Sequence, residues 1–157
     1  MEEEVRLGFL RAFPEAEPID ELEPEEGVLF GLVFRMPDDG GEVVITAEPK
    51  PELDDDVVEA SLTNPDERAA VARAEYCIAV ERPCDSKRAV DAFLEQVRMA
   101  EATCVPGFPA IYDDNAARLR SGGDMRRLTS TQAPPRADEL YCVHVVEGRR
   151  AAWVHTH

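Results

Sequence analysis

The sequence lacks any apolar run long enough to cross a bilayer. None of its hydrophobic stretches approaches the ~18 consecutive apolar residues that a membrane helix needs. The first residues, Met-Glu-Glu-Glu-Val5, are acidic, whereas a secretory signal begins with basic residues. We therefore expect a cytoplasmic protein with no membrane partner.

Basic residues are also scarce. The chain has 17 Lys and Arg against 33 Asp and Glu, so its formal net charge is −16. Residues 1–60 hold 19 acids and 4 bases, whereas residues 61–157 are almost balanced. Because phosphate backbones attract Lys and Arg, we predict no nucleic-acid partner. The simplest interpretation of the acidic half is that it keeps the protein soluble. The alternatives are that it binds a cation, that it binds a basic protein partner, or that it mimics nucleic acid toward such a partner.

Motifs of the common enzyme classes are absent. There is no G-x-S-x-G nucleophile elbow, no Walker phosphate loop, no H-E-x-x-H and no dinucleotide-binding fingerprint. The triplet Asp54-Asp-Asp56 lacks the glycine and glutamate spacing of an EF-hand, so it predicts no calcium site. We therefore expect no cofactor and favour a protein that is not an enzyme.

The four cysteines, at positions 77, 84, 104 and 142, form no C-x-x-C pair. In a cytoplasmic protein such residues are usually reduced thiols that pack as small apolar side chains. We predict four free thiols. The weaker alternatives are a metal or redox role, or a nucleophile pair of Cys142 with His144 or His155.

The three histidines, His144, His155 and His157, all lie in one predicted C-terminal hairpin. If Glu147-Gly148 forms a two-residue turn, His144 lies beside Ala151. It is then roughly 13 Å from His155, too far for the two to share one ion. We therefore predict no metal site.

The clearest structural pattern runs from Glu75 to Asp113. Residues 75–81 are an apolar run of strand length, and Asp85 and Ser86 can cap a helix that follows. This helix is predicted over about 87–103, with Phe93, Leu94 and Val97 among the residues of its apolar face and packed on the strand. Residues 110–112 form the next strand.

The remaining patterns predict short elements on either side. Helices are expected over 3–13, 65–74 and 113–122, with one more turn through Leu128, and the Pro-rich, acidic segments 14–26 and 47–60 are expected to be loops. Strands 27–34 and 42–46 form one hairpin, and 140–146 with 149–155 form another. In that last hairpin a two-residue turn places Cys142 opposite Trp153, and a bulged turn places Tyr141 there instead. The sequence leaves the register open.

Together these elements predict a single domain over 1–157 of the α+β class. It has a mixed, mainly antiparallel sheet with the long helix (about 87–103) packed on one face and a C-terminal hairpin.

Four arginines lie within ten residues around Ser121-Gly-Gly123: Arg118, Arg120, Arg126 and Arg127. Glycine turns can present backbone amides to an anion, and guanidinium groups can clamp it. The alternative is that these arginines pair with the acidic first third of the chain. A recess in which polar groups converge on 118–127 would favour an anion-binding site.

The second half of the chain resembles an uncharacterised family of bacterial domains of unknown function. The resemblance covers about residues 75–157 and rests on the strand and long helix, on Ala110-Ile-Tyr-Asp113, on Ala116-Ala-Arg-Leu-Arg-Ser-Gly122 and on Trp153-Val-His-Thr-His157. It implies a bacterial origin and no catalytic residue. It also implies that the chain is a fragment or a short member, because family members continue past the position of His157.

Our functional hypothesis is a non-enzymatic interaction or regulatory domain of a bacterial cytoplasmic protein, with a protein partner. The alternative is a small enzyme or ligand-binding domain that acts on an anionic small molecule at the Arg118–Arg127 cluster. The sequence does not define an oligomeric state.

Overall fold

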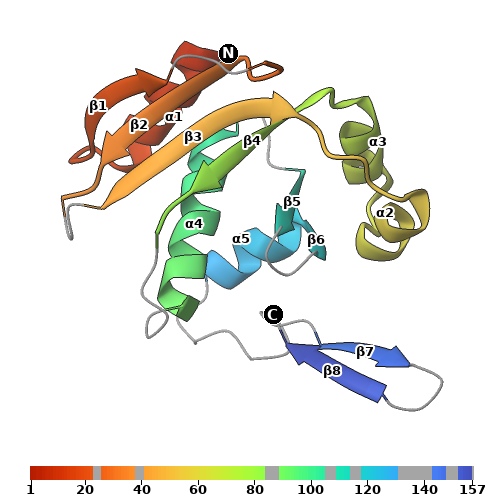
Figure 1. The fold of residues 1–157 in the computed structure, drawn as a ribbon. Helices are drawn as coiled ribbons and strands as arrows, with labels where there is room; N and C mark the ends of the chain where they lie inside the picture. The colour runs from red at the N-terminus through yellow and green to blue at the C-terminus, as the bar shows by residue number, and fades with distance from the viewer. Residues whose placement is uncertain are drawn as a thin grey trace.

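A computed structural model describes residues 1–22, 26–37, 41–83, 89–104, 109–113, 118–130, 143–147 and 152–156. Its architecture is α+β, as the sequence predicts (Figure 1). The helices in this part of the chain are α1 (Glu2–Ala12), α2 (Asp55–Ser61), α3 (Pro65–Arg73), α4 (Ala89–Thr103) and α5 (Gly122–Ser130). The strands are β1 (Glu17–Leu22), β2 (Phe30–Arg35), β3 (Glu42–Pro49), β4 (Tyr76–Glu81), β5 (Ala110–Asp113), β6 (Arg118–Ser121), β7 (Val143–Glu147) and β8 (Ala152–Thr156).

Strands β1 to β4 form one antiparallel sheet in chain order. Ile45 in β3 is paired with Leu32 of β2 on one side and with Val80 of β4 on the other, so apolar residues form a row across the sheet. Burial alternates along β3: Val43 and Ile45 are inaccessible to solvent, and Val44 between them is partly exposed. This period of two means that one face of the strand is directed into the core.

Helices α1 and α4 pack on one face of this sheet (Figure 1). Phe9 of α1 and Met99 of α4 belong to the same buried cluster as the sheet residues Phe34 and Ile45. The rings of Phe9 and Phe34 are tilted, with centroids 4.5 Å apart. The predicted long helix on one face of a mainly antiparallel sheet is therefore confirmed.

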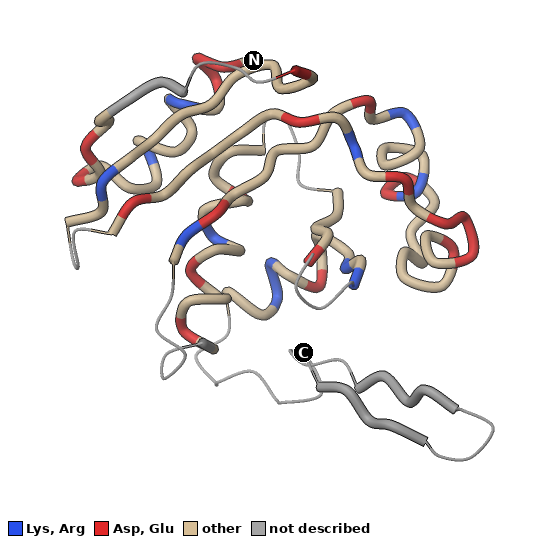
Figure 2. The backbone as a smooth tube through the Cα atoms, viewed as in Figure 1, with Lys and Arg blue, Asp and Glu red and all other residues tan. Residues whose placement is uncertain are grey.

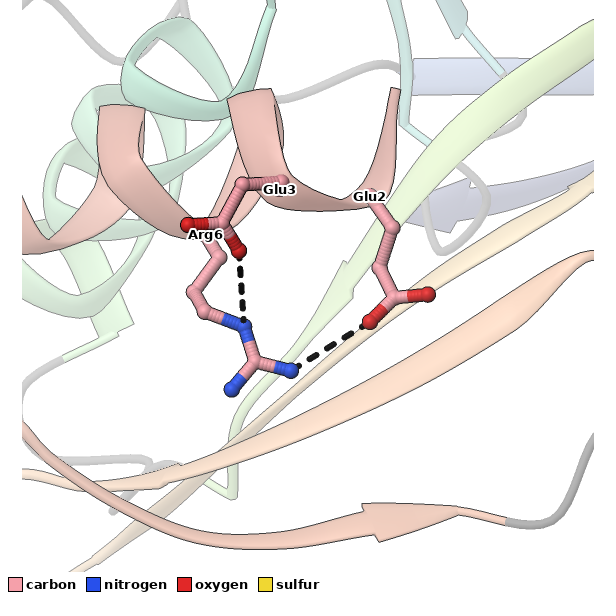
Figure 3. A network of polar contacts seen from close by, with 3 residues as sticks. All are labelled: Glu2, Glu3 and Arg6. Atoms are coloured by element: carbon pink, nitrogen blue, oxygen red, sulfur yellow. Dashed lines mark hydrogen bonds and ion pairs between the residues drawn. The ribbon is translucent and has the colours of Figure 1, made fainter.

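Helix α1 also carries a small surface network, drawn in Figure 3. The Arg6 guanidinium lies 3.3 Å from Glu2 and 3.7 Å from Glu3, one turn before it. Exposed pairs of this kind are typically worth only ~0–1 kcal/mol. The buried side chains of Val5 and Phe9, not these ions, hold α1 against the sheet.

The burial of α4 is wider than its predicted apolar face. Val97 is buried as predicted and packs near Val80 of β4, but Phe93 and Leu94 are only partly buried. Met99, outside the predicted face, is fully buried against α1 and the sheet. The predicted apolar face covered too little of the helix surface, because α4 lies between the sheet and α5 and is contacted on both sides.

Two segments predicted as loops contain regular structure, so that prediction was wrong. Residues Glu17–Leu22 form the edge strand β1, where Pro18 is tolerated beside a β-bulge. Residues Asp55–Ser61 form α2, and the Asp54 carboxylate accepts a hydrogen bond from the Asp56 amide at 2.9 Å. Acidic residues at this position cap and stabilise a helix N-terminus, so the aspartate triplet marks a helix start.

The helix predicted over 113–122 was also wrong. Residues Arg118–Ser121 form β6, which pairs antiparallel with β5, and Ile111 lies opposite Arg120. Gly122, predicted to end a helix, begins α5 instead, and α5 continues past Leu128 to Ser130. Pairing with β5 overrides the weak local helical preference of this segment.

The C-terminal hairpin is present as β7 and β8, but neither predicted register is correct. Val146 lies opposite Trp153, and His144 lies opposite His155. Four residues therefore separate the paired ends at Glu147 and Ala152, where a two-residue or bulged turn was predicted.

Among the described helices, none is long and apolar enough to span a membrane.

Candidate functional site

The structure brings three of the four clustered arginines to one recess. Arg118, Arg120 and Arg127 line a cavity of about 350 Å³ where α2, β6 and α5 meet. Arg126 is not among the lining residues. Helical geometry explains the difference, because Asp124, Arg127 and Leu128 are three or four residues apart and share a face that Arg126 does not. The remaining lining residues are Ala60, Ser61, Leu119, Ser121 and Met125.

Strand β6 is held in place by an apolar contact with α2 and α3. Leu119 is buried in a cluster with Leu62 and Val71, which lie just after α2 and within α3. This cluster fixes the end of α2 beside β6, so that Ala60 and Ser61 form one wall of the recess. The burial of three aliphatic side chains, each worth about 1.5–3 kcal/mol, provides a stable base for the polar groups.

Arg120 is the most deeply placed of the three arginines. Its exposed fraction is 6%, and its guanidinium carbon lies 5.6 Å from the centroid of the Phe93 ring. A cation over an aromatic face gains about 0.5–2 kcal/mol, depending on how far it is desolvated. The ring of α4 therefore orients this guanidinium. Arg120 and Arg127 have further interaction partners within the protein, with which a bound anion would share their several N–H donors.

The start of α5 is fixed by Ser121. The Gly123 amide donates a hydrogen bond to Ser121 Oγ at 3.1 Å, and the Ser121 hydroxyl donates to Glu67 Oε1 at 3.0 Å. A Cβ at Gly123 would lie 3.3 Å from Ser121 Oγ, so the missing side chain allows this close approach. Ser121 thus connects α3, β6 and α5 at the edge of the recess.

The electrostatic character of the recess is opposite to that of the whole chain. Its lining contains three guanidinium groups and one carboxylate, that of Asp124, whereas the formal net charge of the chain is −16. Figure 2 shows the basic residues of β6 and α5 in blue; acidic residues of α2, in red, lie on the neighbouring helix. A local excess of positive charge favours an anionic ligand at this place.

Two of the four predicted thiols lie in the described part of the chain. Cys77 and Cys104 are both free, as predicted; Cys84 and Cys142 lie outside the described residues. Burial raises the pKa of both thiols, with Glu48 adding to the rise at Cys77. A raised pKa leaves little thiolate at neutral pH, so these two residues fit packing roles better than reactive ones.

Several residues of the recess were not identified from the sequence. Ser61 and Glu67 lie in segments separated from the arginine cluster by more than fifty residues, and nothing in their local pattern pointed to it. Gly122 and Gly123, which follow Ser121, were the one local signal. Phe93 was predicted as a core residue, and its position beneath Arg120 required the three-dimensional structure.

Comparison of the chain with models of known protein families, with curated proteins and with solved structures finds no match in any of the three. The geometry of the recess is therefore the basis for the proposed function.

Proposed function

We propose that this protein is a non-enzymatic binding domain, and that the recess between α2, β6 and α5 holds a small anionic molecule. The observation that carries the proposal is the convergence of Arg118, Arg120 and Arg127 on one cavity of about 350 Å³. These residues come from two different elements, β6 and α5, which the fold places around one cavity.

The chemistry of the lining suits a phosphate or carboxylate group. Guanidinium groups bind both anions through paired N–H donors, and such charge-assisted bonds are stronger than neutral ones. The hydroxyls of Ser61 and Ser121 lie in the same lining. Small-molecule sites usually enclose about 300–1,000 Å³, so this recess is at the lower end of that range. We expect a ligand the size of a small metabolite with one anionic group.

A small hydrolase is the second candidate, and one contact favours it. Ser121 Oγ lies 3.0 Å from the Glu67 carboxylate, a separation that suits a nucleophile and its general base. We place this candidate second because the same oxygen accepts the Gly123 amide and so caps α5. A capping role accounts for both hydrogen bonds without any reaction.

The proposal includes a bacterial, cytoplasmic setting and regulation of a protein partner by ligand binding. The free thiols of Cys77 and Cys104 support a reducing compartment. The acidic surface of residues 1–60 supports a basic protein partner and disfavours nucleic acid.

Thermal unfolding in different anions tests the proposed function. Phosphate at about ten times its dissociation constant should stabilise the folded state by about 1.4 kcal/mol, or roughly 3–6 °C in melting temperature. Chloride at equal ionic strength should lack this effect. Arg127→Ala should abolish the phosphate-specific shift, whereas Arg126→Ala, which changes the neighbouring residue outside the lining, should keep it.

Two results would contradict the proposed function. One is a shift of the same size in chloride and phosphate, which would indicate general screening of surface ion pairs. The other is an equal loss of the phosphate effect in both arginine variants. Release of product from small phosphate esters by the wild-type protein, lost in Ser121→Ala, would instead favour the hydrolase.

A further inference from the structure

Strand β4 is the last strand of the four-stranded sheet, and in the described part of the chain no strand pairs with its outer edge (Figure 1). Its six residues all pair with β3 without a register shift. The other edge strand, β1, contains Pro18 beside a β-bulge, and both features discourage a further strand from pairing there. Strand β4 contains neither feature, so its edge lacks this protection.

The hydrogen bonds to β3 show which backbone groups of β4 point outward. The Lys50 amide donates to the Glu75 carbonyl at 2.9 Å, one step beyond the last pair of the two strands. In an antiparallel pair, residues that exchange hydrogen bonds alternate with residues whose N–H and C=O groups point away from the neighbouring strand. Alternate residues of β4 therefore direct these groups to the outer edge: Tyr76, Ile78 and Val80.

The side of this edge that faces α4 exposes apolar surface. Ile78 and Val80 belong to the face of β4 that packs on the core, yet both are only partly buried. Phe93 and Leu94 of α4, which pack in the same cluster as Val80, are also partly buried. A further strand beside β4 would cover this apolar surface, because its own side chains on that face would lie next to these residues.

The opposite side of the edge is acidic. Glu81 is exposed at the end of β4, and Glu48 of β3 lies opposite Cys77, on the same face as Glu81. Neither β3 nor β4 contains Lys or Arg. Arg82, directly after β4, is paired with Glu95 of α4 at 2.6 Å. Basic side chains of an added strand would complement the charge on this face.

We infer that the outer edge of β4 docks an extended segment of a partner protein, which joins the sheet as one further antiparallel strand. Such strand addition gains affinity from main-chain hydrogen bonds and specificity from alternate side chains. The segment that fits alternates apolar residues, directed toward α4, with basic residues, directed toward the carboxylates. The formal net charge of −16 disfavours a second copy of this chain as the occupant. The inference rests on the protein partner of the proposed function and gives that partner a docking site.

A peptide of about ten residues that alternates Val and Lys, a common strand length, tests the inference against the full 157-residue protein. Fluorescence anisotropy measures its binding. In an antiparallel addition, the residues that exchange hydrogen bonds with Ile78 share its face, so they are the Val residues. N-methylation of the Val amides should weaken binding by about tenfold or more, because several donors to β4 are lost. N-methylation of the Lys amides, which point away from β4, keeps the same charge and should leave the affinity unchanged.

Hydrogen exchange provides a second measurement that needs no variant. In the protein alone, the outward amides of Tyr76, Ile78 and Val80 should exchange rapidly. The amides of Cys77 and Ala79, which bond to β3, should exchange slowly. The Val–Lys peptide should slow the exchange of the outward amides.

A charge variant completes the test. Glu81→Gln should weaken peptide binding by about two- to fivefold at low salt. Glu17→Gln, at the β1 edge of the same sheet, is the matched control and should leave binding unchanged.

Three results would overturn the inference. One is absence of peptide binding. Another is equal binding of the two N-methylated peptides, which would indicate attraction by charge alone. The third is slow exchange of the outward amides in the protein alone, which would mean that another segment of this chain or a second copy already covers the edge. None of these results depends on the arginine recess, which is tested with phosphate.

Discussion

The sheet with α1 and the region of β5, β6 and α5 are held together by different kinds of contact. In the first, Phe9, Phe34 and Ile45 are fully buried and pack directly on one another across a helix and two strands. In the second, a smaller apolar cluster that includes Met125 supports a layer of polar groups, among them Arg120. One region is mainly an apolar core, and the other presents charge to a cavity.

This difference separates the contacts that stabilise the fold from the recess that we propose binds a ligand. In the described part of the chain, apolar side chains of α1, α4 and the sheet form this core, and their contacts explain why the chain folds. The recess contains Arg120, whose side chain is 6% exposed, and burying a charge usually costs free energy. A charged side chain in such a place is a better candidate for binding than an apolar core residue.

The largest effect is expected in the sheet core. Phe9→Ala removes a fully buried ring that contacts Phe34 at a centroid distance of 4.5 Å. Replacing a buried phenylalanine by alanine typically costs about 3–5 kcal/mol, through lost transfer free energy and the cavity left behind. Urea unfolding followed by circular dichroism would measure the change in the free energy of unfolding.

Leu7→Ala on the same helix is the control for this variant. Leu7 is 51% exposed, so its truncation should change stability by no more than about 0.5–1 kcal/mol. If Phe9→Ala cost no more than Leu7→Ala, α1 would not belong to the core, and the contrast between the two regions would fail.

The two regions also differ in how well the sequence predicts them. Strands β2, β3 and β4 were predicted because long apolar runs alternate or stand between clear turn residues. Helix α3 was predicted because Asn64 caps it and Pro65 begins it; the Asn64 side chain accepts from the Asp66 amide at 2.9 Å. In these cases, local chemistry and tertiary packing favour the same structure.

The recess was predicted only in part, because its shape depends on the pairing of β5 with β6 and not on the local sequence pattern. The arginine cluster was predicted as a candidate anion-binding site, and three of its four members line the recess, but Arg118 and Arg120 were wrongly assigned to a helix. A four-residue strand has too few positions to show a period of two. The set of arginines that line the cavity depends on the pairing of β6 with β5 and on the rotation of α5 about its axis. The sequence alone therefore could not show that Arg126 lies outside the lining.

An intermediate loss of stability is expected for the replacement of Ser121, at the edge of the recess. Ser121→Ala removes the hydroxyl that caps α5 and donates to Glu67. Loss of a helix cap costs about 0.5–2 kcal/mol, which urea unfolding can resolve. Glu67→Gln retains an acceptor for the hydroxyl and should cost less than Ser121→Ala. An equal or greater loss in Glu67→Gln would mean that the carboxylate stabilises the protein through some other contact.

The smallest effect concerns the partly buried thiol of Cys104, just after α4, and is measured as a change of stability with pH. Burial raises the pKa of Cys104; a hydrogen bond with Thr103 opposes this shift, and the Glu101 carboxylate adds to it. In the unfolded chain the same thiol ionises near its ordinary value of about 8.5. As pH rises through that value, the unfolded state loses its proton before the folded state does. The free energy of unfolding should therefore fall with increasing pH, until the folded thiol also ionises.

Cys104→Ala should remove this contribution, so that stability declines less between about pH 8 and 10 than in the wild type. The decisive quantity is the difference between the two slopes, measured by urea unfolding at several pH values, because the contributions of all other groups are common to both proteins. Cys77→Ala, at a less deeply buried thiol, should change the slope by a smaller amount, since burial is the first cause of the raised pKa at both positions. Identical slopes for the wild type and Cys104→Ala would mean that this thiol ionises as readily in the folded protein as in the unfolded chain. The contact between α4 and α5 would then admit more water than the burial of Val97 and Met125 indicates.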